Sequence, residues 1–307
     1  MESNQMMLQK KLPALKDAEG SAVPIDLPPV IDAHVHVFPE KIFKSVWKWF
    51  DEYGWPVRYQ LRASDILSFL LSRGVRHVVA LQYAHKPGIS RELNAFMVRL
   101  CHQFPGQVTG LATVFPGEAG AREILKDAFS QGLNGVKLHA HVQCFDMNSQ
   151  DMERIYELCS TEKKPLLMHV GQEPKSPAYA CDPYVLCRAD KLERVIQHFP
   201  ELKVCVPHLG MGEYAAYQKL IRQYDNLWLD TAMALTDYLP GNQPIALTEM
   251  RTDRILYGSD FPNIPFSWDR ELRWLHRLPL SEEALSLILS RNAAQFYQIS
   301  TGPDTAC

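Results

Sequence analysis

The 307-residue chain is 46% hydrophobic and has a formal net charge of −3, so it offers neither a basic field for nucleic acid nor a polybasic patch for a membrane surface. No apolar run reaches the length of about 20 residues that spans a bilayer, and the first residues lack the charged and apolar regions of a secretion signal. Seven scattered cysteines without a CxxC pair indicate a reducing compartment, so we expect a cytoplasmic protein.

Residues 1–28 are polar and then carry several prolines, which predicts an N-terminal arm. The first strand is predicted at residues 30–37. Side chains two apart on a strand share a face, so Asp32, His34 and His36 are expected to point the same way. Two imidazoles on one face can bind a metal ion, although an isolated His-x-His more often consists of ordinary strand histidines.

An aromatic-rich segment with the spacing of a helix follows at about residues 38–63, and it is too long for a simple turn. In a barrel, the loops at the carboxyl ends of the strands frame the active site. We therefore interpret this segment as a helical insertion after the first strand that covers the site, packs onto the barrel, or does both. Within it, Trp55 and Arg58 are candidate contacts to an aromatic or acidic substrate, with plain packing as the alternative.

From residue 75 onward, short apolar runs alternate with helical stretches. The runs lie at residues 75–82, 108–115, 135–140, 165–170, 202–208, 226–232 and 254–260, and the helical stretches at residues 92–101, 119–130, 150–161, 186–198, 213–224 and 244–250, before terminal helices. Strands that are apolar on both faces and alternate with helices predict a parallel sheet. Eight such units predict an α/β fold of the (β/α)8 TIM barrel type, and with no linker in between, residues 29–307 form one predicted domain.

The polar residues of the predicted strands gather at the carboxyl ends, where barrel active sites lie. They are His34 and His36 on strand one, Lys137 and His139 on strand four, His169 on strand five, His208 on strand six, Asp230 on strand seven and Asp260 on strand eight. Four histidines and one aspartate, from strands one, five, six and eight, form a nitrogen-rich ligand set. Such a set suits zinc, manganese, iron or cobalt.

Taken together, these motifs resemble the amidohydrolase superfamily and, within it, the amidohydrolase-related (amidohydrolase 2) branch, which includes aminocarboxymuconate semialdehyde decarboxylase-like proteins. The matching segments are 31-IDAHVHVFP-39, 135-GVKLHAHVQ-143, 165-PLLMHVG-171, 206-VPHLGMGE-213, 226-NLWLDTA-232, 256-LYGSDFP-262 and 291-RNAAQFYQI-299. The resemblance implies one divalent metal ion, with zinc expected first. Its ligands would be His34, His36, His169 and Asp260, and His208 would lie at the edge of the site.

The reaction follows from the charge of the ion, because a divalent metal lowers the pKa of bound water from 15.7 to about 7 and polarises a carbonyl. The resemblance thus implies a metal-dependent hydrolase of a small lactone, amide or ester. Asp260 would accept the proton of the water and His208 would stabilise the oxyanion, as the two catalytic residues. The alternative is a non-oxidative decarboxylase of an aromatic or unsaturated carboxylic acid, since the same ligand frame serves both reactions. A non-catalytic binding barrel is a remote third option.

Other polar residues of the rim have less definite roles. Lys137 and His139 are candidate substrate-binding residues, and Lys137 is expected to orient a substrate carboxylate or pair with a local acid. A carboxylated lysine that bridges two metals, as in some amidohydrolases, is the less favoured interpretation of Lys137. Asp230 is interpreted as a helix cap or a hydrogen-bond partner. We expect a small-molecule substrate, no nucleic-acid or membrane partner, and leave a homodimer open.

Overall fold

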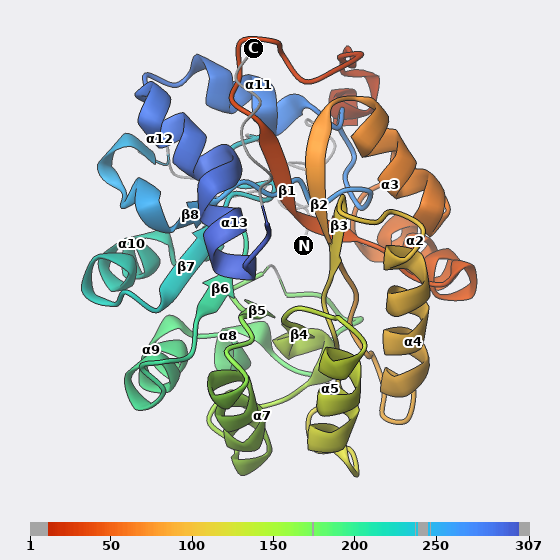
Figure 1. Ribbon diagram of the computed structural model, residues 1–307, viewed down its shortest axis with the longest axis vertical. Coiled ribbons are helices and arrows are strands. Elements are labelled where there is room, and N and C mark those ends of the chain that lie inside the picture. The colour runs from red at the N-terminus through yellow and green to blue at the C-terminus, as the bar shows by residue number, and fades with distance from the viewer. Residues whose placement is uncertain (1–11, 174, 237, 239–244, 246, 301–307) are drawn as a thin grey trace.

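Eight parallel strands form a ring at the centre of the protein, in a computed structural model that describes residues 12–300 except 174, 237, 239–244 and 246 (Figure 1). The strands are β1 Val30–His36, β2 Val75–Leu81, β3 Val108–Gly110, β4 Val136–His139, β5 Leu166–His169, β6 Val204–Val206, β7 Leu227–Asp230 and β8 Ile255–Leu256. Strands β1 to β3 and β4 to β8 pair in chain order. The bridges Val35–Phe261 and Ala112–Val136 join the two sheets, so the predicted closed barrel is confirmed.

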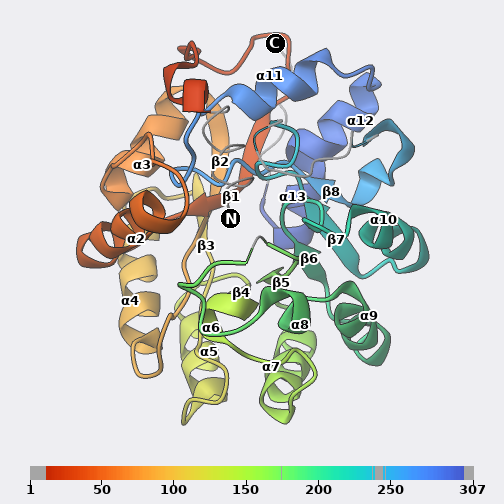
Figure 2. The ribbon, with the colours of Figure 1, turned by 180° about the vertical axis from the view of Figure 1, so that it is seen from behind.

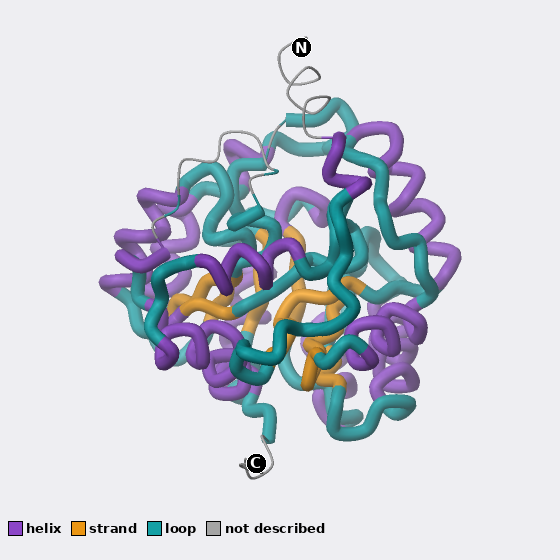
Figure 3. The backbone as a smooth tube through the Cα atoms, turned by 90° about the horizontal axis from the view of Figure 1, so that it is seen from above, coloured by secondary structure: helices purple, strands orange, loops and turns teal. Residues whose placement is uncertain are grey.

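Helices surround this ring, as Figure 3 shows from another side. They are α2 Glu40–Tyr53, α3 Ala63–Ser72, α4 Ser90–Cys101, α5 Ala121–Ser130, α6 Ala140–Gln143, α7 Gln150–Thr161, α8 Pro183–Leu186, α9 Ala189–His198, α10 Tyr214–Gln223, α11 Arg270–Arg277, α12 Glu282–Ser286 and α13 Asn292–Tyr297, with the short helical turns η1 Leu12–Lys16, η2 Leu247–Glu249, η3 Thr252–Arg254 and η4 Leu287–Arg291. Within the described ranges, no helix has both the length and the apolar character needed to cross a bilayer.

Two of the expected helices differ from the prediction. Of the stretch expected at residues 186–198, only residues 189–198 form α9, because Arg188 before them has extended backbone angles, and Leu186 ends the separate helix α8. The stretch expected at residues 244–250 contains only the three-residue turn η2, and residues 244 and 246 lie outside the described residues. By contrast, α7 has the predicted bounds. Sequence patterns thus located the long amphipathic helices better than the short irregular ones.

The two ends of the barrel differ in what fills them. At one end, Ile31 and Ala33 of β1 pack with Trp228 of β7 and Phe296 of α13 in a small apolar cluster, and Figure 1 shows α13 across this end of the ring. The main core lies between the strands and the outer helices. The polar residues at the carboxyl ends of the strands lie at the other end of the barrel, the end that faces the viewer in Figure 2.

The segment before β1 is held against the barrel by polar contacts. Glu19 accepts hydrogen bonds from Arg58 Nη2 at 3.2 Å, Tyr59 Oη at 2.5 Å and Arg73 Nη2 at 3.2 Å. Trp268 Nε1 donates to the carbonyl oxygen of Gly20 at 2.9 Å. The described part of the arm therefore packs onto residues that follow α2, α3 and β8.

Candidate metal centre

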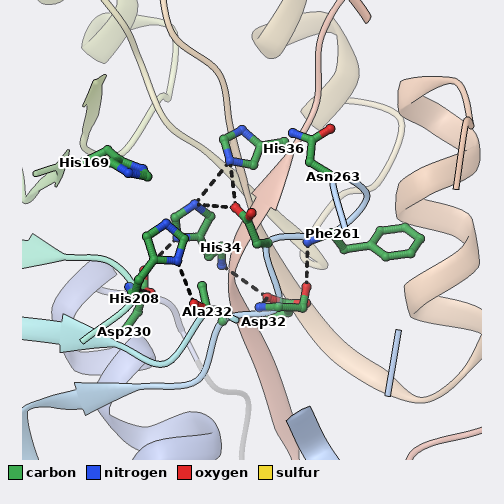
Figure 4. A network of polar contacts seen from close by, with 12 residues as sticks. Asp32, His34, His36, His169, His208, Asp230, Ala232, Phe261 and Asn263 are labelled. Atoms are coloured by element: carbon green, nitrogen blue, oxygen red, sulfur yellow. Dashed lines mark hydrogen bonds and ion pairs between the residues drawn. The ribbon is translucent and has the colours of Figure 1, made fainter. Parts of the chain in front are cut away.

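Three ligand-type atoms meet at the polar end of the barrel. His34 Nε2 lies 3.3 Å from His36 Nε2 and 3.2 Å from Asp260 Oδ1, and His36 Nε2 lies 3.0 Å from the same Asp260 oxygen. Figure 4 shows the two histidines of this group next to each other. Zinc binds nitrogen and oxygen ligands at about 2.0–2.2 Å, and two ligands at that radius, about a right angle apart, are themselves about 3 Å apart. The spacing therefore fits one ion between three predicted ligands.

Hydrogen bonds orient these ligands. His34 Nδ1 lies 2.7 Å from Asp230 Oδ2, so Nδ1 donates to the carboxylate and Nε2 is left to face the other ligands. The second oxygen of Asp230 accepts from the backbone N–H of His208 at 3.0 Å. Asp260 has a left-handed backbone with φ of 64°, and its N–H donates to the carbonyl oxygen of His34 at 3.0 Å. Asp230 is thus a hydrogen-bond partner, one of the two roles considered from the sequence.

The protonation of the three side chains suits a cation. Burial lowers the pKa of His34 well below its ordinary value, and burial also lowers the pKa of His36. Burial alone would raise the pKa of the Asp260 carboxyl. The hydrogen bond from His36 and the electrostatic effects of His36 and His208 outweigh burial and lower this pKa below its ordinary value. Two neutral imidazoles and one carboxylate are a ligand set that zinc and its neighbours accept.

The strand that carries the two histidines is less regular than predicted. Between Asp32 and Val35, three steps along β1 match two along β2, so a bulge interrupts the alternation of faces. The Asp32 carboxylate accepts from Ser259 Oγ at 2.5 Å and from the N–H groups of Ser259 and His34 at 3.0 and 3.2 Å. Asp32 therefore fixes the loop that leads to Asp260 and is not one of the grouped ligand atoms.

The fourth predicted ligand, His169, belongs to a neighbouring group. Its Nε2 lies 2.6 Å from Glu173 Oε1, and His169, Glu173 and His208 have ligand-type atoms within 4.8 Å of one another. Figure 4 shows His169 set apart from His34 and His36. The structure therefore brings together three of the four predicted ligands and places the fourth beside them, paired with a carboxylate.

Glu173 is the residue of this region that sequence reasoning missed. Its carboxylate contacts His169 Nε2 at 2.6 Å, His141 Nε2 at 3.1 Å and Tyr179 Oη at 2.9 Å. The prediction considered polar residues at strand ends, whereas Glu173 lies in the loop after β5. The sequence feature that could have indicated Glu173 was its position four residues after His169. We name Glu173, His141, His169 and Tyr179 the glutamate cluster.

A cavity of about 930 Å³ opens onto both groups. His36, His139, His169, His208 and Asp260 line its base, and its walls include the aromatic residues Phe38, Trp49, Phe50, Trp55, Tyr83 and Tyr179. Helix α2, within the predicted insertion, supplies part of this wall. The Trp55 ring lines the cavity while its Nε1 donates to the carbonyl oxygen of Asn263 at 2.8 Å.

Two candidate substrate-binding residues lie outside the lining of the cavity. Arg58 does not line the cavity, because its guanidinium is paired with Glu19 and donates to the carbonyl oxygen of Asp17 at 3.0 Å. Lys137 is fully buried, has no hydrogen-bond partner for Nζ among the described residues, and is also absent from the cavity lining. His85, which was not among the predicted site residues, also lines the cavity.

Comparisons with known proteins agree with this architecture. The family model described as amidohydrolase matches residues 31–299. A 5-carboxyvanillate decarboxylase from Novosphingobium aromaticivorans, complexed with manganese, has a TM-score of 0.63 and 16% identity, with coverage of 92% of this chain and 100% of that one. A probable 2-pyrone-4,6-dicarboxylic acid hydrolase from Acinetobacter baumannii has a TM-score of 0.61 and 18% identity, covering 88% and 99%.

A third solved structure is similar to the same extent. A 2,6-dihydroxybenzoate decarboxylase complexed with 2,6-dihydroxybenzoate has a TM-score of 0.65 and 16% identity, with coverage of 89% of this chain and 100% of that one. At these identities the three structures support the fold and leave the reaction undecided. The comparison with curated proteins returns no match.

Proposed function

The chain belongs to the amidohydrolase family, and on that premise we propose that it is a metal-dependent hydrolase of a small, planar carbonyl compound such as a lactone, amide or ester. The observation that carries this proposal is the convergence of His34 Nε2, His36 Nε2 and Asp260 Oδ1, with His36 and Asp260 lining an aromatic-walled cavity. A divalent ion bound there would acidify water and polarise a carbonyl. Zinc, manganese, iron and cobalt all suit this ligand set.

Asp260 is the proposed acceptor of the proton that water loses. Its carboxyl lies at the base of the cavity, and the hydrogen bond from His36 helps to keep its pKa below the ordinary value, so it is ionised at neutral pH. The same group would then return the proton to the leaving group. Since Asp260 Oδ1 belongs to the ligand group, the proton acceptor lies next to the place where water becomes acidic.

His208 is the proposed second acid–base group. Its Nδ1 lies 2.6 Å from the carbonyl oxygen of Ala232, so Nδ1 donates its hydrogen to that oxygen and Nε2 is the ring nitrogen left for the substrate. His208 Nε2 would therefore take up a proton from solvent before water attacks and, once protonated, donate a hydrogen bond to the developing oxyanion. This order refines the role in oxyanion stabilisation that the sequence suggested.

The walls of the cavity determine the shape of the substrate. The rings of Phe38 and Tyr83 meet edge to face with centroids 5.1 Å apart, and Trp49 stacks with Tyr179 at 5.6 Å. Such rings favour a flat, apolar body and exclude water around it. The polar atoms of a substrate would lie toward the histidines at the base.

A second candidate is the non-oxidative decarboxylation of an aromatic or unsaturated carboxylic acid. The aromatic walls favour it, and two proteins with a similar fold are named as decarboxylases of aromatic acids. In that reaction the carbon–carboxylate bond breaks, carbon dioxide leaves, and the ring carbon takes a proton that Asp260 or His208 would first take up from solvent, since Asp260 is ionised beforehand. The same residues would thus act as acid instead of base.

One experiment separates the two reactions. The purified protein, loaded with zinc or manganese in parallel, is screened against planar lactones, esters, amides and aromatic acids in water enriched in oxygen-18. Incorporation of the heavy oxygen into an acid product supports hydrolysis, whereas carbon dioxide release without incorporation rejects hydrolysis and favours decarboxylation. Asp260→Asn should abolish the reaction, and Asp225→Asn, at a highly exposed aspartate, is the matched control.

A further inference from the structure

A pair of cysteines lies beside the cavity wall, outside the residues that the proposed function uses. Cys144 follows α6 and Cys181 precedes α8, and Figure 2 shows these two short helices side by side. Both thiols contact the carbonyl oxygen of His141, Cys144 Sγ at 3.4 Å and Cys181 Sγ at 3.2 Å. The two sulfur atoms are therefore close in space, although α7 and β5 lie between them in the chain.

The two thiols differ in accessibility. Cys144 is exposed and Cys181 is partly buried. Burial, together with the hydrogen bond between the two thiols, raises the pKa of Cys181 to about 12. Because the thiolate is the nucleophile, Cys144 is the sulfur that meets and attacks a dissolved oxidant, and Cys181 is placed to react with the product. An exposed thiol next to a second thiol is the arrangement of a site that forms a disulfide.

We propose that Cys144 and Cys181 are a modification site at which a peroxide converts the two thiols into an intramolecular disulfide. The Cys144 thiolate attacks one peroxide oxygen, the O–O bond breaks, and hydroxide leaves as Cys144 becomes a sulfenic acid. Cys181 then attacks this sulfur, the S–O bond breaks, and water leaves as the S–S bond forms. In total, two thiols and one hydrogen peroxide give one disulfide and two waters.

The disulfide would restrain the wall of the cavity. Tyr179 lies two residues from Cys181, stacks on Trp49 of α2, and donates to Glu173 Oε2 at 2.9 Å. A bond from Cys181 to Cys144, the residue after α6, would tie this part of the wall to the chain three residues beyond His141. This inference concerns oxidation of the protein itself and holds whether the enzyme is a hydrolase or a decarboxylase.

The test is a mass measurement on the full-length protein. Reduced protein is treated with an equimolar amount of hydrogen peroxide, and its intact mass and its disulfide-linked peptides are determined. We expect a loss of two hydrogens, a linked peptide pair containing Cys144 and Cys181, and reversal by dithiothreitol. Cys144→Ser and Cys181→Ser should abolish the linked pair, and Cys101→Ser should retain it. In Cys181→Ser, the sulfenic acid on Cys144 should be captured by dimedone.

Two results would overturn the proposal. One is a treated protein that keeps the mass of the thiol form and yields no linked pair. The other is a disulfide between Cys181 and any cysteine other than Cys144, such as the buried Cys187. Wild-type peptide mapping decides the matter even where a variant folds poorly. The restraint on the wall has its own readout, because hydrogen exchange of the peptide that covers residues 175–182 should slow after oxidation. Unchanged exchange would contradict that part.

Discussion

The metal-ligand group and the glutamate cluster lie side by side but are built differently. His34 and His36 lie two residues apart on β1, where a bulge begins before Val35, and Asp260 comes from the loop after β8. In the glutamate cluster, only His169 lies on a strand, whereas His141 belongs to the short helix α6 and both Glu173 and Tyr179 belong to the loop after β5. Backbone hydrogen bonds of the barrel strands and of the residues next to them hold the first group in position, whereas loops position most of the second group.

The two groups also differ in the contacts that orient their side chains. The ligand group receives its orientation from main-chain hydrogen bonds and from Asp230 behind His34. The glutamate cluster consists of three donors around one carboxylate. A barrel can therefore keep its metal site while its loops change the groups around the substrate. Variants in the two groups test whether they act as separate units.

The largest effect is expected from His34→Ala, which removes one of three ligands. Since loss of a supporting partner alone costs about 10–100-fold in metal affinity, loss of a ligand should cost at least about 100-fold. Metal analysis and competition with a chelator measure this. Wild-type protein should also lose thermal stability when chelated, while His34→Ala should not respond. His198→Ala, at an exposed helix end, is the control, and equal metal in both variants would reject the proposed centre.

A smaller loss of metal is expected from Asp230→Asn. The amide oxygen still accepts from His34 Nδ1 but is a weaker acceptor than a carboxylate oxygen, so we expect about a 10–100-fold weaker affinity with unchanged stoichiometry at saturating metal. Asp230 also accepts from the N–H of His208, so a modest fall in melting temperature should accompany the change. An affinity equal to that of the wild type would show that Asp230 does not orient the ligand.

The barrel and the ligand group could be predicted from the sequence because both depend on repeated local patterns. Strands buried on both faces are continuous apolar runs, and the carboxyl ends of parallel strands meet at one end of a barrel. His34, His36 and Asp260 each lie at or just beyond a strand end, so their meeting follows from the fold. The bulge in β1 could not be foreseen, because it depends on the pairing of β1 with β2.

The sequence did not predict side-chain contacts that depend on loops or on segments far apart in the chain. Arg58 was a candidate substrate contact, but its partner Glu19 lies 39 positions earlier in the arm. Glu173 lies beyond the end of β5, where no periodic pattern fixes its direction. Lys137 is on the expected strand, yet whether such a side chain ends in the cavity or beneath it depends on the packing of its neighbours. These three residues needed the folded structure.

Glu173→Gln tests the separation of the two groups directly. The amide can still accept one hydrogen bond but has lost the charge that holds two imidazoles, and hydrogen bonds to charged groups contribute about 1.5–3 kcal/mol. We expect turnover to fall about 10-fold while metal affinity changes by less than about 3-fold. Affinity as low as that of His34→Ala would show instead that His169 and Glu173 belong to one site with His34, His36 and Asp260. Glu157→Gln, an exposed glutamate of α7, is the matched control.

Tyr179→Phe should have the smallest effect, because it removes one of three donors to Glu173 and keeps the ring that stacks on Trp49. Loss of one such hydrogen bond costs about 1 kcal/mol, so we expect a melting temperature lower by about 2–4 °C and no change in metal affinity. Tyr184→Phe, at an exposed tyrosine of α8, should leave both unchanged. If Tyr179→Phe weakened metal binding, the loop would be part of the metal site, and the division between strand-built and loop-built groups would be wrong.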